Sequence, residues 1–192
     1  CRNYAAHARE MGHDPDRETP FFFTKAPDAV VTAPELAYPT ATEDVHPECE
    51  MIVALAKGGR DITVDKALDC VFGYGVGFDL TRRDMQSVAK DLRRPWSLSK
   101  DFDDAAPCSQ LHPVSEVGHV ENGTLRFTVN GETRQESDLN KMIWSVPETI
   151  SFLSGLITLL AGDVIMTGTP DGVSAVVTGD TLVGHVDGLT DL

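Results

Sequence analysis

The sequence predicts a single β-rich α+β domain over residues 1–192. Apolar, β-branched runs typical of strands outnumber the amphipathic segments typical of helices, and the helices are scattered between the strands. No internal repeat, low-complexity tract or Pro/Gly/Ser-rich linker divides the chain. A single domain of 192 residues is long enough to bury a substantial hydrophobic core.

The first half of the chain alternates between short helices and strands. The expected elements, in order, are a helix over 4–11, a strand over 29–32, a loop over 39–46, a strand over 48–56, an amphipathic helix over 64–71, a strand that ends at Asp79, and a helix over 83–92. We expect the strand over 48–56 to enter the core, because residues 51–56 are all apolar.

A long loop and a hairpin follow. Residues 95–113 contain three prolines and two aromatic residues, which favours a long functional or covering loop. Asn130-Gly131 predicts a tight turn between strands over 125–129 and 132–136, because this turn needs positive φ at both central residues.

The last predicted helix has a clear start and end. Ser145 and Glu148 form a capping-box pattern with an early proline between them. The apolar face of the helix extends to Leu160, and Gly162 lies where a C-terminal cap is needed. Residues 163–167 then predict a strand that leads into the turn Thr167-Gly-Thr-Pro170.

Composition and charge exclude two classes of partner. A formal net charge of −14 argues against nucleic acid, whose phosphates need a basic surface. The longest apolar segment, residues 150–161, is interrupted by polar residues and is too short to span a bilayer. We therefore expect neither nucleic acid nor a membrane as a partner.

The cysteines give no sign of a disulfide framework or a zinc site. Positions 1, 49, 70 and 108 form no Cys-x-x-Cys pair, which favours reduced thiols and a cytoplasmic location. Cys49 is expected to be a small buried hydrophobe. The chain opens on Cys1 and no signal peptide is visible, so we expect an N-terminal piece to be missing.

Three acidic residues form the strongest candidate for a functional site. Glu48 and Glu50 alternate along a predicted strand, so both carboxylates point to the same face. Asp79 lies where a second strand is expected to stop and turn. Buried carboxylates need positive charge nearby, and three hard oxygen donors suit Mg²⁺ or Mn²⁺ with coordination positions left open. On its own, a Glu-x-Glu pair can also be a solvated strand face.

Other polar residues have a functional and an ordinary interpretation. His7 and Glu10 share a helical face, where the carboxylate could orient an imidazole that acts as a general base, or form a surface pair of little consequence. Arg83 and Gln86 could face a substrate beside Asp79, or lie on a solvated helix face.

Short motifs over nearly the whole chain occur together in one known family. They are, in order, Asn3-Tyr4-x-x-His7-x-x-Glu10, Phe22-Phe23-Thr24-Lys25, His46-Pro47-Glu48-Cys49-Glu50, the segment Gly77–Asp84, Lys100 and the segment Gly162–Pro170. In this order and spacing they resemble the fumarylacetoacetate hydrolase superfamily, and within it the acylpyruvate-hydrolase branch. The chain departs from the family pattern at Cys49, where valine is frequent, and at Ser174-Ala175, where Gly-Pro is usual.

The resemblance implies a fold, a cofactor and an assembly. The fold would be the β-rich, rolled mixed sheet of the family's C-terminal domain, and the protein would be a homodimer. Glu48, Glu50 and Asp79 would bind Mg²⁺ or Mn²⁺.

The resemblance also implies roles for six further residues. The catalytic residues would be His7, Glu10 and Lys100, with His7 as the general base and Lys100 stabilising negative charge. The residues that bind substrate would be Arg83, Gln86 and Thr169, the last in a turn that would expose a hydroxyl and backbone N–H groups to a carboxylate.

The implied activity is metal-dependent hydrolysis of the carbon–carbon bond of an acylpyruvate, a small anionic keto acid. Fumarylpyruvate, cleaved to fumarate and pyruvate in gentisate catabolism, would be the first candidate substrate. Oxaloacetate decarboxylation and keto-acid isomerisation are alternatives within the superfamily. A non-catalytic domain that binds a metal ion or a dicarboxylate is the alternative of a different class.

Overall fold

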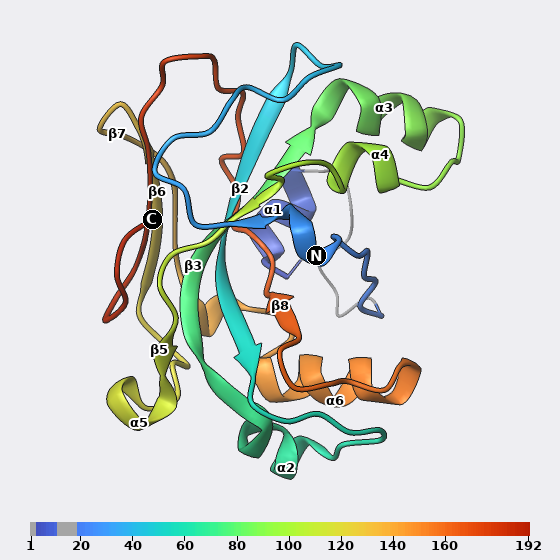
Figure 1. Ribbon diagram of the computed structural model, residues 1–192, viewed down its shortest axis with the longest axis vertical. Helices are drawn as coiled ribbons and strands as arrows, with labels where there is room; N and C mark the ends of the chain where they lie inside the picture. The colour runs from blue at the N-terminus through green and yellow to red at the C-terminus, as the bar shows by residue number, and fades with distance from the viewer. Residues whose placement is uncertain (1–2, 11–18) are drawn as a thin grey trace.

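Two long antiparallel strands form the centre of the structure, a computed structural model that describes residues 3–10 and 19–192 (Figure 1). They are β2 (Val45–Leu55) and β3 (Val71–Arg82). β5 (His112–Pro113) pairs with β3 and β8 (Val164–Met166) pairs with β2, so the sheet has the order β5-β3-β2-β8. Residues 51–55 are buried, as the apolar run in this strand predicts, whereas Ala56 is exposed. Residues 47–50 are buried as well.

A second sheet packs against one face of the central pair. It consists of β6 (Thr124–Val129), β7 (Glu132–Asp138) and β9 (Leu182–Val186), in the order β7-β6-β9. The predicted hairpin is confirmed: Asn130 and Gly131, between β6 and β7, have φ values of 52° and 83°. The rings of Phe78 and Phe127 join the two sheets edge to face, with 5.1 Å between their centroids.

Strand alternation divides the side chains of β2 into two sets. Cys49, Met51 and Val53 belong to the hydrophobic core, together with side chains of the second sheet. Glu48 and Glu50 are on the opposite face, because side chains of a strand alternate. That face is the one on which the candidate site is built.

The remaining elements are short, and most of the helices lie on the side of β2 and β3 that is away from the second sheet (Figure 1). The α-helices are α1 (Ala5–Glu10), α2 (Val64–Ala67), α3 (Arg83–Asp91), α4 (Ser97–Lys100), α5 (Val114–Val117) and α6 (Val146–Leu156). The 3₁₀ turns are Pro27–Ala29, Leu68–Cys70 and Leu139–Lys141. No helix in the described ranges is long and apolar enough to cross a membrane.

A small parallel pair makes the strand pairing mixed. β1 (Val30–Val31) runs parallel to β4 (Ala106–Pro107), whereas the strands of the two larger sheets pair antiparallel. Strands and helices together confirm the predicted α+β class.

The predicted boundaries around the acidic site are wrong in one respect. β3 does not stop at Asp79 but continues to Arg82, because β2 begins at Val45 rather than 48. The two strands therefore pair from Val45 with Arg82 onward. This extension puts Thr81 on the same face as Asp79.

Three further predictions differ from the structure. Residues 95–113 are not a plain loop, because α4, β4 and β5 lie within them. The last helix ends at Leu156 rather than near 160, and Gly162, with φ of 90°, turns the chain into β8 instead of capping the helix. The helix expected over 64–71 is α2 followed by a 3₁₀ turn, after which β3 begins at Val71.

Glycines at alternate positions of β3 allow a close approach of the chain. A Cβ on Gly73 would lie 2.1 Å from the main-chain oxygen of His112. A Cβ on Gly75 would lie 3.2 Å from Leu111 Cδ2, and one on Gly77 would lie 2.5 Å from Ile52 Cδ1 of β2. At Gly73 only glycine lets the main chain of β5 lie this close to the strand.

Replacing Gly73 with alanine should destabilise the fold by about 1–3 kcal/mol or more, because a backbone oxygen must move to make room. Urea denaturation measures the change. Gly155→Ala is the matched control: its Cβ would meet nothing within 4 Å, and alanine favours the helix by about 1 kcal/mol. Equal stabilities of the two variants would contradict the close approach.

Candidate metal centre

Three carboxylates meet on the face of the central sheet opposite the core. The strand register places Glu48 directly opposite Asp79, and Glu50 opposite Gly77. One carboxylate oxygen from each of the three residues lies within 4.8 Å of the others. Glu48, Glu50 and Asp79 are 6%, 0% and 1% exposed, so the alternative of a solvated strand face is excluded.

Lys100 is the central cation of the cluster. Its Nζ donates hydrogen bonds to Glu48 Oε2 at 2.9 Å, Asp79 Oδ2 at 2.8 Å and Thr81 Oγ1 at 2.6 Å. Although burial opposes its charge, Asp79 and Glu48 raise the pKa of Lys100 above its ordinary value. The lysine therefore stays protonated near neutral pH.

Two more cations complete the cluster. Lys25 Nζ lies 2.9 Å from Asp79 Oδ1 and donates to the main-chain oxygens of Leu80 and Lys100. Arg83 Nη2 donates to Glu48 Oε1 at 2.6 Å. Burial would raise the pKa of Glu48, but Lys100 and Arg83 outweigh it and hold this pKa far below its usual range.

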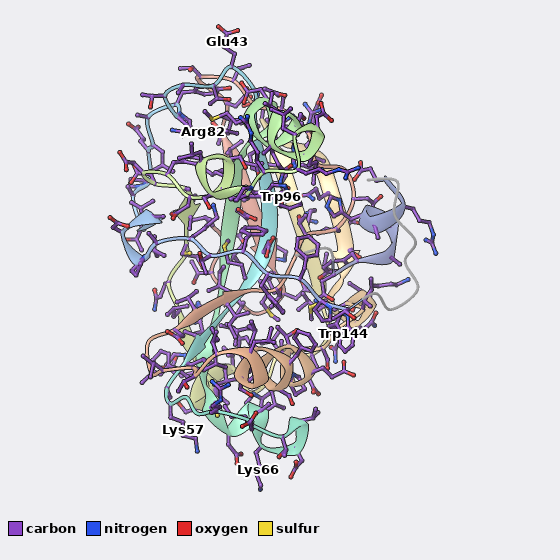
Figure 2. The ribbon with its side chains drawn as sticks, turned by 90° about the vertical axis from the view of Figure 1, so that its right-hand side faces the viewer. Glu43, Lys57, Lys66, Arg82, Trp96 and Trp144 are labelled. Carbon is purple, nitrogen blue, oxygen red and sulfur yellow. The ribbon has the colours of Figure 1, made fainter. Side chains whose placement is uncertain are left out.

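Aromatic rings cover the cluster. Trp96 lies near the middle of the face shown in Figure 2 and packs against Phe21 and Phe23, with centroids 5.6 and 6.2 Å away. The ring of Phe23 lies 4.9 Å from Lys100 Nζ. The contact of the ring with the ammonium adds a cation–π interaction to the hydrogen bonds of Lys100.

Glu50 has no cationic partner among the described side chains. Gly168 N donates to its Oε2 at 2.5 Å, whereas its Oε1 is buried and accepts no hydrogen bond. Burial, with smaller contributions from Asp79 and Glu48, raises the pKa of Glu50 to about 7. An ionised Glu50 needs further positive charge.

A divalent cation fits the atoms that remain without partners. Besides Glu50 Oε1, Asp79 Oδ1 accepts no hydrogen bond of good geometry, although the charge of Lys25 is nearby. Orphaned buried carboxylate oxygens are costly in a folded protein. A set of carboxylate oxygens suits Mg²⁺ or Mn²⁺, so Glu48, Glu50 and Asp79 could hold such an ion.

The His7–Glu10 pair is present in α1. His7 Nδ1 lies 3.1 Å from Glu10 Oε2, and His7 is 4% exposed, so it is not the surface pair considered as the alternative. Burial lowers the pKa of His7 below its ordinary value, which keeps the imidazole neutral and able to accept a proton near neutrality.

Two contacts fix α1 beside the acidic cluster. Asn3 Nδ2 donates to the main-chain oxygens of Trp144 and Thr167, each at 2.8 Å. Gly172 N donates to the Glu10 carboxylate at 3.2 Å. The dyad is therefore anchored to the same turn, 167–172, that contacts Glu50 through Gly168.

The side chains predicted to bind substrate form hydrogen bonds within the protein. Arg83 Nη1 donates to Gln86 Oε1 at 2.5 Å, and Gln86 is buried rather than on a solvated helix face. Thr169 does not expose its hydroxyl, because this group donates to Cys49 O and accepts from Gln135 Nε2. Contact of these residues with a substrate stays a prediction.

Sequence reasoning left three contributors to the site without a role. Thr81 shares a face with Asp79, so strand alternation could have identified it had the strand been extended. Lys25 is 54 residues from Asp79 in the chain, so its only signal in the sequence is the match to a family position. Gln135 lies on an otherwise polar, exposed strand and has no signal in the sequence.

Cys49 has the expected structural role. Its side chain is buried, and burial raises the pKa of the thiol, which therefore stays protonated. No reactivity is needed to explain it.

Residues 1–192 match the fumarylacetoacetate (FAA) hydrolase C-terminal family. The chain belongs to the fumarylacetoacetate hydrolase family. The predicted α+β fold of this family's C-terminal domain is thereby confirmed.

Individual members of the family are similar over most of their length. A fumarylpyruvate hydrolase of Ralstonia sp. is 42% identical over 185 residues, which are 95% of this chain and 96% of the relative. A mitochondrial oxaloacetate decarboxylase of Dictyostelium discoideum is 39% identical over 195 residues, covering 100% of this chain and 88% of the relative.

One solved structure of the family contains ligands. The fumarylpyruvate hydrolase of Pseudomonas aeruginosa, in complex with Mn²⁺ and pyruvate, is 50% identical and superposes with a TM-score of 0.97. The match covers 100% of this chain and 84% of that one.

The affinity for Mn²⁺ should depend on pH through Glu50. Metal binding needs the ionised carboxylate, so below its pKa of about 7 a proton must leave first. The affinity should fall about tenfold per pH unit below 7 and level off above it. Calorimetric titration with Mn²⁺ between about pH 5.5 and about pH 8 measures this.

Glu50→Gln is the control, because it removes the titrating group and should remove both the pH dependence and most of the affinity. An unchanged affinity of the native chain from about pH 5.5 to about pH 7 would contradict the raised pKa of Glu50, and an unchanged affinity of Glu50→Gln would show that Glu50 is not a ligand.

Proposed function

We propose that the chain hydrolyses the carbon–carbon bond of an acylpyruvate, with fumarylpyruvate as the first candidate, using Mg²⁺ or Mn²⁺ at Glu48, Glu50 and Asp79. One observation carries the proposal: a buried Glu50 oxygen that accepts no hydrogen bond lies in a cluster anchored to the same turn as Glu10, the partner of the buried His7. A site that only stored a metal ion would have no use for the buried base.

The charge of the centre supports a dianionic substrate. The cations of Lys25, Lys100 and Arg83 already match the three carboxylates when all are ionised. A divalent ion would leave an excess of two positive charges. Fumarylpyruvate carries two carboxylates, so it would neutralise the centre despite the net charge of −14 on the chain.

The charged side chains would stabilise the reaction from fixed positions. A bound divalent ion would supply Lewis-acid stabilisation of oxygen atoms on the 2-oxo acid. Lys100 would contribute a second positive charge, held in place by Glu48, Asp79 and Thr81, as negative charge develops on the departing pyruvate. Arg83 and Gln86 would orient the substrate beside Glu48.

His7 would act as the general base that takes a proton from the attacking water. Its neutral state follows from burial, and Glu10 would orient the ring and stabilise the imidazolium that forms. Gly172 N would in turn hold Glu10.

Oxaloacetate decarboxylation is the second candidate. The Dictyostelium relative with that name is nearly as similar as the fumarylpyruvate hydrolase of Ralstonia, and oxaloacetate is also a dianion. Decarboxylation needs no attacking water, so it would depend less on His7. Keto-acid isomerisation is a third possibility, and the homodimer stays a prediction that light scattering would test.

A substrate panel tests the proposed function. Acylpyruvates and oxaloacetate are each incubated with the protein and Mn²⁺ or Mg²⁺, with and without EDTA. Metal-dependent loss of the enol absorbance of fumarylpyruvate, faster than loss of oxaloacetate, is the expected result. Binding of oxalate without turnover of any keto acid would support a non-catalytic domain instead.

His7→Ala should retain Mn²⁺ and oxalate binding but lose hydrolysis by about 10²–10⁴-fold, the usual contribution of a positioned base. Glu10→Gln should lose less, because the imidazole remains. Steady-state rates, with metal affinity as the control, check both variants. Undiminished hydrolysis by His7→Ala would exclude the role.

A further inference from the structure

We propose that Gln135 is a positioning residue for the metal centre: its side-chain amide fixes the strand between Glu48 and Glu50, together with the turn that contacts Glu50. This inference rests on the proposed function, since it concerns the same metal site. Gln135 contacts none of the three acids itself. It acts through main-chain groups and Thr169.

The amide of Gln135 makes three hydrogen bonds and is 1% exposed. Its Oε1 accepts from Cys49 N at 3.1 Å. Its Nε2 donates to Thr169 Oγ1 at 2.8 Å and to Pro170 O at 2.7 Å. One side chain of the second sheet is thus bonded both to β2 and to the turn after β8.

These bonds lie at the edge of β2 that faces away from β3, at a point that β8 does not reach. β8 pairs with β2 only at Ile52, Val53 and Ala54, and the chain then leaves the sheet after a contact between Thr167 N and Met51 O. Without further partners the main-chain groups of Cys49 would be buried and unpaired. Gln135 accepts from Cys49 N, and the Thr169 hydroxyl donates to Cys49 O at 2.9 Å.

The position of Cys49 gives these bonds their consequence. Cys49 is the residue between two proposed ligands, so any shift of its main chain moves both carboxylates. The same amide holds the turn in which Gly168 N donates to Glu50 Oε2 at 2.5 Å. Loss of the amide would therefore disturb Glu50 from both sides.

β7, the strand that carries Gln135, also lies against the residue that holds the His–Glu pair. Gly172, whose N–H holds Glu10, has φ of 90° and lies so close to β7 that a Cβ would be 2.0 Å from Arg134 O. Gln135 thus bonds to Thr169 and Pro170 of the turn 167–172, and Arg134 packs against Gly172 at its end. Replacing a residue that holds metal ligands without binding the metal itself typically weakens metal affinity by about 10–100-fold.

The experiment compares Mn²⁺ affinities of Gln135→Met and Ser154→Ala with that of the native chain. Methionine keeps the volume of the glutamine but forms none of its hydrogen bonds. Ser154 is buried in α6, where its hydroxyl accepts from Ile62 N and donates to Ser151 O. Ser154→Ala therefore also breaks buried hydrogen bonds, but away from the acids.

We expect Mn²⁺ to bind about 10–100-fold more weakly to Gln135→Met, measured by electron paramagnetic resonance of free Mn²⁺, and with native affinity to Ser154→Ala. Thermal denaturation confirms that each variant is folded at the temperature of the titration. If Gln135→Met does not fold, Thr169→Val replaces it. This variant breaks the link from Gln135 to Cys49 O and should weaken binding in the same direction.

Native affinity in the folded Gln135→Met variant, or in Thr169→Val where that variant replaces it, would overturn the inference. An equal loss in Ser154→Ala would also overturn it, because the loss would then follow stability rather than position. If the native chain itself binds no Mn²⁺, the proposed metal centre fails, and that result is distinct from the other two.

Discussion

The burial of three carboxylates on one face of a two-stranded ribbon is the constraint on which the rest of the structure depends. Charges removed from water are costly unless opposite charges and hydrogen bonds replace the solvent. Lys100, Lys25 and Arg83 meet this need for Glu48 and Asp79. Glu50 is left with a single main-chain donor, so the cluster is complete only when another cation joins it.

The surrounding segments are arranged to serve this cluster. Lys25 and Lys100 come from segments distant in the chain and meet through the oxygen of Lys100, which accepts from Lys25 Nζ. The turn after β8 brings Gly168 N to Glu50 and Gly172 N to Glu10, so the acids and the His–Glu pair share one support. The second sheet provides the core for β2 and β3 and also supplies Gln135.

Local patterns in the sequence predict the fold class, the hairpin at Asn130-Gly131 and the start of α6, because each depends on neighbouring residues. The acids could be predicted from strand alternation, and their meeting follows from one antiparallel pairing. The end of α6 and the length of β3 could not be predicted from the sequence, because both depend on contacts with segments distant in the chain. Lys25 and Gln135 escape local patterns altogether, since each reaches the site only through the fold.

A structure of the Mn²⁺-loaded protein, with the anomalous signal of manganese, tests the central claim most directly. The account predicts one strong peak within coordination distance of Glu50 Oε1 and Asp79 Oδ1, the two buried carboxylate oxygens among the described residues that accept no hydrogen bond. Lys100 should remain bonded to Glu48 and Asp79 in that structure. A peak elsewhere, or no peak while Glu50 stays protonated and unpartnered, would contradict the account.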